Sequence, residues 1–217
     1  MSKTNTLILL CVLISLFAWG TSDSIARLLV FSTSGLIEGR IWTLVTALFV
    51  HADIIHLFGN MIFLYVFGNT LENTVKSRNL LLVFFTGGIT TFFFGIPFYS
   101  PYATLVGASA AIFTLTAVVM IVKPLKFSWL FLLPVGLVAI LYFLYNVLAV
   151  YHGSSGSVAY VSHIMGFLIG VPFGVAWSPK WIKNLIVTLC LLAIYLLIIT
   201  FGIPIIFDLI KKVLTNS

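Results

Sequence analysis

Four polar side chains of the types that hydrolytic enzymes use lie near the start of long apolar runs in this chain of 217 residues. They are His56 and Asn60 in HADIIHLFGN, Ser109 in GASA, and His163 in SHIMGFLIG. A serine hydroxyl becomes a nucleophile when a base within hydrogen-bond reach takes its proton, and neutral histidine suits that task near neutral pH. An amide and a second imidazole can stabilise an oxyanion. The residue types therefore indicate a hydrolytic site.

These side chains must be positioned by helices that cross a membrane. With 61% hydrophobic residues, 7% charged residues and a mean hydropathy of +1.21, the composition excludes a water-soluble globular domain. We predict an all-α membrane protein that forms a single polytopic domain over residues 1–217. Seven apolar runs approach the length of roughly 20 residues that a helix needs to cross a bilayer. They are Thr6–Gly20, His51–Leu71, Leu80–Phe98, Leu105–Val122, Trp129–Val150, Val158–Trp177 and Ile182–Phe207.

The basic residues indicate the orientation of these spans. If the N-terminus is cytoplasmic, seven of the 11 lysines and arginines lie inside, which obeys the positive-inside rule. The inside group is Lys3, Lys76, Arg78, Lys123, Lys126, Lys180 and Lys183, and the outside group is Arg27, Arg40, Lys211 and Lys212. Because they form no continuous patch, we expect no nucleic-acid partner. We expect a multi-pass protein of a prokaryotic plasma membrane, because the cytoplasmic N-terminus is too short for a transit peptide.

The four polar side chains converge in this orientation. The three spans that begin near residues 51, 105 and 158 all enter from the outside, and each candidate residue lies one or two turns into its span. That corresponds to a shared depth of roughly 5–12 Å at the helical rise per residue. His56 and Asn60 are four residues apart, so they share a helix face. The site is therefore expected to open toward the outside.

The serine and its expected base sit among small residues that allow close helix contacts. Ser109 begins its span next to alanines, where the free N–H groups of a helix N-terminus suit an oxyanion. His163 precedes Gly166 and Gly170, a small face that we expect to pack on the alanine-rich start of the serine span. None of the 5 acidic residues lies on either span, so we predict a Ser–His dyad. Asp53 is interpreted as a helix N-cap.

Taken together, the motifs resemble those of the rhomboid family of intramembrane serine proteases. The resemblance covers Gly39 to about Trp177. The matching residues are His51, His56, Asn60, Phe67, Gly68 and Glu72 in the second span, Gly107, Ala108 and Ser109 in the fourth, and Ser162, His163, Gly166 and Gly170 in the sixth. The resemblance implies a six-helix transmembrane bundle over about residues 5–178. The run at about residues 182–207 is then an additional seventh span.

The resemblance also implies roles for single residues. Ser109 is expected to be the nucleophile, and His163 the general base and later the general acid. Asn60, His56 and the backbone amide of Ser109 would form the oxyanion hole. Phe113 stands where the family often has a tyrosine that stacks on the catalytic histidine. No metal or organic cofactor is implied, and the expected partners are transmembrane protein substrates within the lipid bilayer.

The first loop departs from the family pattern after Trp42. Thr43 follows it where the family often has an arginine, and Arg40 is the nearest residue that could substitute.

Two other functions remain open at this point. An inactive rhomboid-like protein that binds or chaperones transmembrane clients would share the fold, although such relatives typically lack the serine or the histidine. A transporter or channel would be expected to carry charged groups along its pathway, whereas this polar cluster is confined to the outer third.

The remaining polar or helix-breaking residues have structural interpretations. His51 is expected to be structural or to line the mouth of the site, on a different face from His56, so that the two form no metal pair. Glu72 is expected to cap or cross-link helix ends. Pro134 and Gly136 are expected to kink the fifth span, which would suit a lateral gate toward lipid.

Overall fold

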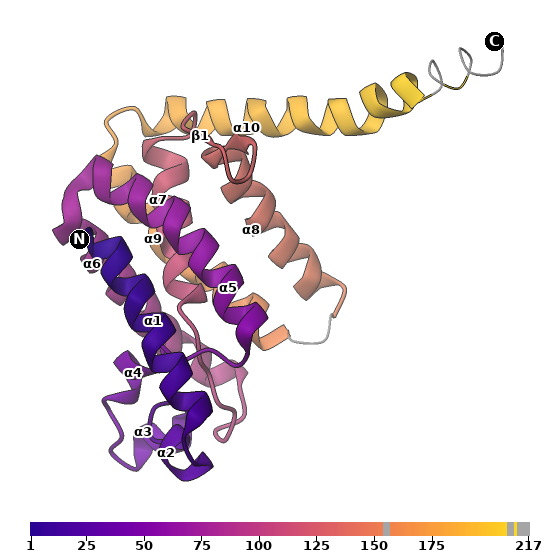
Figure 1. The fold of residues 1–217 in the computed structure, drawn as a ribbon. Coiled ribbons are helices and arrows are strands. Elements are labelled where there is room, and N and C mark those ends of the chain that lie inside the picture. The colour runs from indigo at the N-terminus through magenta and orange to yellow at the C-terminus, as the bar shows by residue number, and fades with distance from the viewer. Residues whose placement is uncertain (154–156, 208–210, 212–217) are drawn as a thin grey trace.

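Apolar helices make up most of the computed structural model, which describes residues 1–153, 157–207 and 211 (Figure 1). The main helices are α1 (Lys3–Gly20), α5 (Ile54–Phe63), α6 (Asn69–Gly95), α7 (Ser109–Val122), α8 (Val135–Tyr151), α9 (Ser157–Trp177) and α10 (Trp181–Leu197). The segments long and apolar enough to cross a bilayer are Lys3–Gly20, Ile54–Phe98, Tyr160–Trp177 and Trp181–Phe207. The prediction of an all-α membrane protein is confirmed, and the exact number of spans stays a prediction.

The segment Ile54–Phe98 reverses direction within its length. It has 45 residues, about twice what one crossing requires, and it contains α5, a π-helical turn (Leu64–Gly68) and α6. Lys76 interrupts α6 with a φ of 72°. Thr70 accepts a hydrogen bond from Lys126 at one end of the bundle, whereas Thr91 lines the same cavity as His56 at the other. The chain therefore runs from the His56 end to Lys76 and back.

Helix α7 lies at the centre of the bundle and packs closely against α9. Every residue of α7 from Ala110 to Ile121 is buried. A Cβ atom on Gly166 or Gly170 of α9 would overlap the backbone carbonyl of Ala110 or Thr114. The hydroxyl of Thr114 lies 2.9 Å from the carbonyl of Gly166 and 3.0 Å from that of Ala110. The predicted contact between the small face of the sixth span and the start of the serine span is confirmed.

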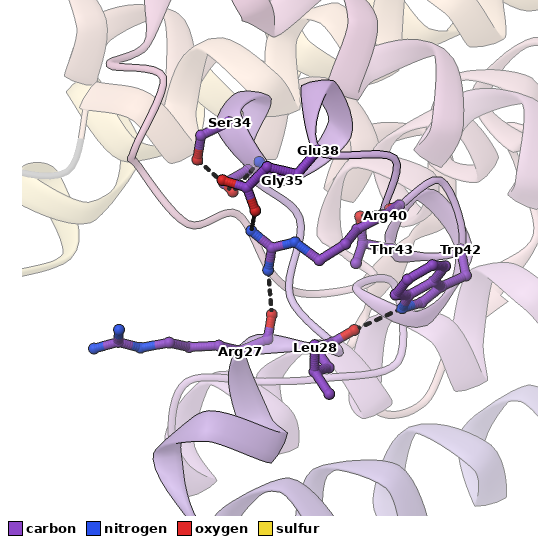
Figure 2. A network of polar contacts seen from close by, with 9 residues as sticks. Arg27, Leu28, Ser34, Gly35, Glu38, Arg40, Trp42 and Thr43 are labelled. Carbon is purple, nitrogen blue, oxygen red and sulfur yellow. Dashed lines mark hydrogen bonds and ion pairs between the residues drawn. The ribbon is translucent and has the colours of Figure 1, made fainter.

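The linker after α1 folds back on itself and does not span. It forms the short helices α2 (Asp23–Arg27), α3 (Thr33–Ile37) and α4 (Thr43–Thr46). The guanidinium of Arg40 donates to the carbonyl of Arg27 at 3.0 Å and pairs with Glu38 at 3.0 Å (Figure 2). The indole of Trp42 donates to the carbonyl of Leu28 at 2.8 Å. Arg40 thus holds the linker together from within.

In two of the predicted spans, the helix begins several residues after the start of the apolar run. Leu105 forms an isolated antiparallel bridge with Phe31, so α7 starts only at Ser109. The run after Trp129 starts in a small hairpin of β1 (Phe127–Ser128) and β2 (Leu133–Pro134), and α8 begins at Val135. Pro134 therefore precedes the helix, and the predicted kink is wrong. The reason is that a short apolar run is compatible with strand as well as helix.

Gly136 serves close packing in place of a kink. A Cβ atom at this position would lie 2.9 Å from the carbonyl oxygen of Pro124, so the start of α8 sits directly against the preceding turn.

Glu72 ties the beginning of α1 to α6. Its carboxylate accepts the backbone N–H groups of Lys3 at 2.8 Å and Thr4 at 2.9 Å, and the hydroxyls of Thr4 and Ser77 at 2.7 Å each. A negative charge is favourable at a helix N-terminus, where backbone N–H groups lack partners. The predicted cross-link between helix ends is confirmed.

The C-terminal helix α10 leaves the bundle. Figure 1 shows it running across the end opposite the short linker helices and extending beyond the other helices. Asn184 attaches its first part by donating to the carbonyl of Ile121 at 2.8 Å. The helical chain continues through a π-helical turn, Ile198–Gly202. Lys212, which we predicted on the outside, lies beyond the described residues.

Replacing Gly166 with alanine should destabilise the bundle. The added methyl group would meet the backbone of Ala110, which cannot rotate away, and overpacking of this kind costs about 1–3 kcal/mol. Gly59→Ala is the matched control, because a Cβ there meets no atom within 4 Å and alanine favours a helix by about 1 kcal/mol. Thermal unfolding in detergent should show a lower midpoint for Gly166→Ala alone. Equal midpoints would contradict the close α7–α9 contact.

Candidate active site

A cavity of about 400 Å³ brings together residues from α5, α6, α7 and α9. Its lining includes His56, Ser109 and His163, three of the four predicted site residues. A second cavity of about 500 Å³ lies at the opposite end of the bundle beside Lys126, and no histidine lines it. The first cavity is therefore the candidate site.

The turn before α7 presents Ser109 to this cavity. Gly107 adopts a φ of +111°, which side chains disfavour, and its N–H donates to the carbonyl of Ala47 at 2.9 Å. Ser109 is the first residue of α7, so the N–H groups around it belong to the unpaired first turn of a helix. The hydroxyl of Ser109 and the unpaired N–H groups of this first turn therefore lie close together at the start of α7.

His51 holds this turn against α1. The hydroxyl of Ser15 donates to the carbonyl of Phe49 at 3.1 Å, so it must accept the proton on Nδ1 of His51, also at 3.1 Å. The opposite ring nitrogen then accepts the N–H of Ala108 at 3.5 Å. The ring is buried, with 1% of His51 exposed. Of the two predicted roles, the structural one is confirmed.

The expectation that His51 and His56 point apart is wrong. Their ring centroids are 5.1 Å apart, because His51 precedes α5 and is not carried on the helix. Both nitrogens of His51 already have partners within the protein. Within the described ranges 1–153, 157–207 and 211, no three His, Cys, Asp or Glu side chains group as a metal site would require.

His56 and Asn60 both direct N–H groups toward Gly107. The backbone N–H of Ala52 approaches Nδ1 of His56 at 3.4 Å, which places the imidazole proton on Nε2. A Cβ atom on Gly107 would lie 2.9 Å from that Nε2 and 3.5 Å from Nδ2 of Asn60. Asp53 accepts the backbone N–H of His56 at 2.7 Å and is the helix N-cap, as predicted.

The amide of Asn60 is unusual because its donor is unused. Asn60 is 7% exposed, and its Nδ2 is buried without a hydrogen-bond partner among the described residues. Leaving a buried donor unpaired costs about 1–3 kcal/mol. A buried donor in this state is well suited to an oxygen atom supplied from outside the protein.

His163 is positioned by a hydrogen bond to α8 and by stacking on an aromatic ring of α7. Its Nδ1 lies 2.7 Å from the Oδ1 atom of Asn146 on α8. Its ring stacks on Phe113, with centroids 4.5 Å apart and an interplanar angle of 10°, which confirms the predicted stacking. The stack continues to Tyr142 and then to Phe63 of α5, with 4.4 Å between successive centroids.

The partner of His163 was missed at the sequence level. Asn146 lies in the apolar run of the fifth span, where an amide is costly and therefore marks a polar partner or a function. That signal was present, but nothing in the spacing linked it to His163.

The hydroxyl and the imidazole share the cavity without a direct bond. In the part of the chain that the structure describes, no hydrogen bond joins Ser109 to His163. Catalytic hydrogen bonds are often long in the absence of substrate and shorten when it binds. A hydroxyl, a basic imidazole and two convergent donors together suit acyl transfer.

Comparison with known proteins places the chain in a family. The family model described as the Rhomboid domain matches residues 38–180. Over 139 residues the chain is 30% identical to Rhomboid-like protein 11, chloroplastic, of Arabidopsis thaliana. That alignment covers 58% of this chain and 49% of the relative, so the chain spans about half the length of the curated relative it matches.

The fold and the cavity define an integral membrane protein with a polar site built between apolar helices. The chain belongs to the rhomboid family.

Gly107→Ala should both strain the turn and displace His56. An alanine at this positive φ costs about 1–2 kcal/mol, and its methyl group would also collide with the imidazole. Gly39→Ala is the matched control, since Gly39 has a φ of +88° but open space around it. Both variants should unfold at lower temperature, and only Gly107→Ala should slow labelling of Ser109 by a fluorophosphonate. Equal labelling rates would place His56 away from the turn.

Proposed function

We propose that the protein is an intramembrane serine endopeptidase that hydrolyses peptide bonds in or near transmembrane segments by a Ser109–His163 dyad. The observation that carries this proposal is the arrangement around Gly107. Ser109, the first residue of α7, shares its cavity with the imidazole of His163, and N–H donors of His56 and Asn60 lie beside Gly107, two residues before the serine. One of these donors, Nδ2 of Asn60, is buried and has no partner among the described residues.

The proposed reaction uses these groups in turn. Nε2 of His163 removes the proton of Ser109, whose oxygen attacks the peptide carbonyl. The developing oxyanion accepts hydrogen bonds from Asn60, from Nε2–H of His56 and from the N–H of Ser109. His163 then returns the proton to the leaving amine, and the acyl group stays on Ser109. Water, deprotonated by His163, hydrolyses this ester and restores the serine.

The substrate is proposed to reach the cavity from the bilayer between α5 and α8. Phe63 of α5 and Tyr142 of α8 close this side, with ring centroids 4.4 Å apart, so they must separate. A transmembrane helix keeps its peptide groups hydrogen-bonded, and local unwinding must expose the scissile bond. Substrates with helix-breaking residues near the cut are therefore favoured.

The proposed orientation places the N-terminus in the cytoplasm and the cavity toward the outside. Lys123 and Lys126 lie in the turn after α7, at the end of that helix remote from Ser109. Arg27 and Arg40 lie in the linker on the side of the cavity, and they are fewer than the seven lysines and arginines predicted on the cytoplasmic side. This asymmetry follows the positive-inside rule.

Purified protein in liposomes should cleave a fluorescently labelled single-span substrate, and Ser109→Ala and His163→Ala should each abolish cleavage. Loss of the nucleophile or base should lower kcat by at least about 10³-fold. Ser100→Ala and His152→Ala are the matched controls, because both side chains are exposed and lie outside the cavity lining. A fluorophosphonate should label the wild type and both controls.

The outcomes separate the candidate functions. Cleavage that survives either Ser109→Ala or His163→Ala would refute the dyad. A wild type that neither cleaves nor takes up the fluorophosphonate, but still binds the substrate, would favour a client-binding protein.

Asn60→Leu should separate activity from stability. The substitution removes a buried donor that has no partner in the described part of the chain, so the midpoint of thermal unfolding should stay the same or rise. Because an oxyanion donor is lost, kcat should fall by about 10²–10³-fold. The control Asn184→Leu removes a donor that is used, so it should lower the midpoint and leave cleavage intact. A destabilised Asn60→Leu would mean that this amide has a structural partner.

A further inference from the structure

A buried amide on α8 faces the imidazole of His163. Asn146 is 1% exposed, and its Oδ1 lies 2.7 Å from Nδ1 of His163. Its Nδ2 donates to the carbonyl of Tyr142, one turn earlier on the same helix, at 2.7 Å. Both ends of the amide are therefore engaged, one within α8 and one across to α9.

The bond to Tyr142 decides which way the amide points. A rotation by 180° would set Oδ1 against the carbonyl of Tyr142, and two acceptors at this distance repel each other. It would also turn two N–H donors toward His163. The observed orientation is the one in which the amide oxygen faces the imidazole.

The orientation of the amide in turn decides the tautomer of His163. An amide oxygen can only accept, so Nδ1 must carry the proton. In the neutral ring the lone pair is then on Nε2, at the opposite edge. That is the nitrogen a serine hydroxyl requires as its base.

We propose that Asn146 is a positioning residue that holds His163 in the Nδ1–H tautomer, so that Nε2 is free to accept the proton of Ser109. This inference rests on the proposed peptidase function. The sequence motifs predict a dyad of Ser109 and His163, and Asn146 on α8 adds a third residue that orients the histidine. Asn146 touches neither substrate nor nucleophile and acts only through the imidazole.

The group that orients His163 is neutral, and the carboxylates of Asp53 and Glu72 lie elsewhere. The titratable side chains that face the ring are His56 across the cavity, Tyr160 on α9, and Tyr142 through the stacked Phe113. Among the described carboxylates, Asp53 caps α5 and Glu72 binds the start of α1 at the opposite end. The amide therefore orients the ring without adding a negative charge beside it.

Steady-state kinetics of Asn146→Ala and Asn146→Asp test the proposal. Asn146→Ala should lower kcat by about 10- to 100-fold with little change in KM, a part of what a positioned general base contributes. Asn146→Asp keeps an acceptor oxygen at the same place and should restore cleavage at high pH. Because its carboxylate favours the imidazolium, the acid limb of kcat/KM should move to higher pH by about one unit or more.

The matched control is Asn184→Ala. Asn184 also donates from Nδ2 to a backbone carbonyl, but on α10 and away from the cavity. It should lower the unfolding midpoint without moving the pH profile. If Asn146→Ala behaves like Asn184→Ala, with an unchanged kcat and profile, the positioning role is refuted.

Nitrogen-15 NMR of histidine-labelled protein tests the tautomer without substrate. The chain has four histidines, and His163→Ala identifies the signals of His163. Wild-type His163 should give a protonated Nδ1 and an unprotonated Nε2, and Asn146→Ala should shift the signals toward a mixture of tautomers. An Nε2–H tautomer in the wild type would overturn the proposal. A wild type that shows the Nδ1–H tautomer but cleaves nothing would refute the peptidase function and leave the positioning of His163 intact.

Discussion

The close contact between the backbones of α7 and α9 is the constraint on which the rest of the structure depends. Gly166 and Gly170 leave no room for side chains against Ala110 and Thr114, and the hydroxyl of Thr114 adds a polar contact across the same interface. In a bilayer, helices gain no hydrophobic energy by leaving lipid for one another, so close van der Waals packing and interhelical hydrogen bonds must hold them together. Because Ser109 begins α7 and His163 lies one turn before Gly166, the contact that stabilises the bundle also brings these two residues to one cavity.

The buried polar groups near the cavity fall into two classes, those with hydrogen-bond partners among the described residues and those without. His51 and Asn146 are buried and have partners at both ends, as expected for groups removed from water. The Nδ2 of Asn60 is buried without a partner among the described residues. The first class fixes the positions of the turn before Ser109 and of the imidazole. The second leaves a donor available beside the cavity, as the proposed oxyanion-binding role of Asn60 requires.

Features set by a periodic pattern within one helix were predicted correctly more often than features of turns and hairpins. The apolar runs predicted the helices, and the spacing of small residues predicted the α7–α9 contact, since both depend on periodicities within one helix. The roles of Asp53 and Glu72 followed from their places at helix ends. Errors arose where the chain leaves the regular helix for a turn or a short hairpin, because helical periodicity does not describe these segments. The hairpin that replaces the first part of the fifth span depends on pairing with residues 127 and 128, and the approach of His51 to His56 depends on a turn outside the helix.

The amino-acid sequence by itself determined that this is a helical membrane protein of the rhomboid family, and it singled out Ser109, His163, His56 and Asn60, because composition, periodicity and motif order are local properties. Only the tertiary structure decided which nitrogen of His56 and of His163 carries the proton, that the donor of Asn60 has no partner among the described residues, and that Asn146 faces His163. These features depend on distances of about 3 Å between atoms on different helices or between a helix and the turn beside it. Such distances are set by how the helices pack, and no spacing along a single chain segment encodes them.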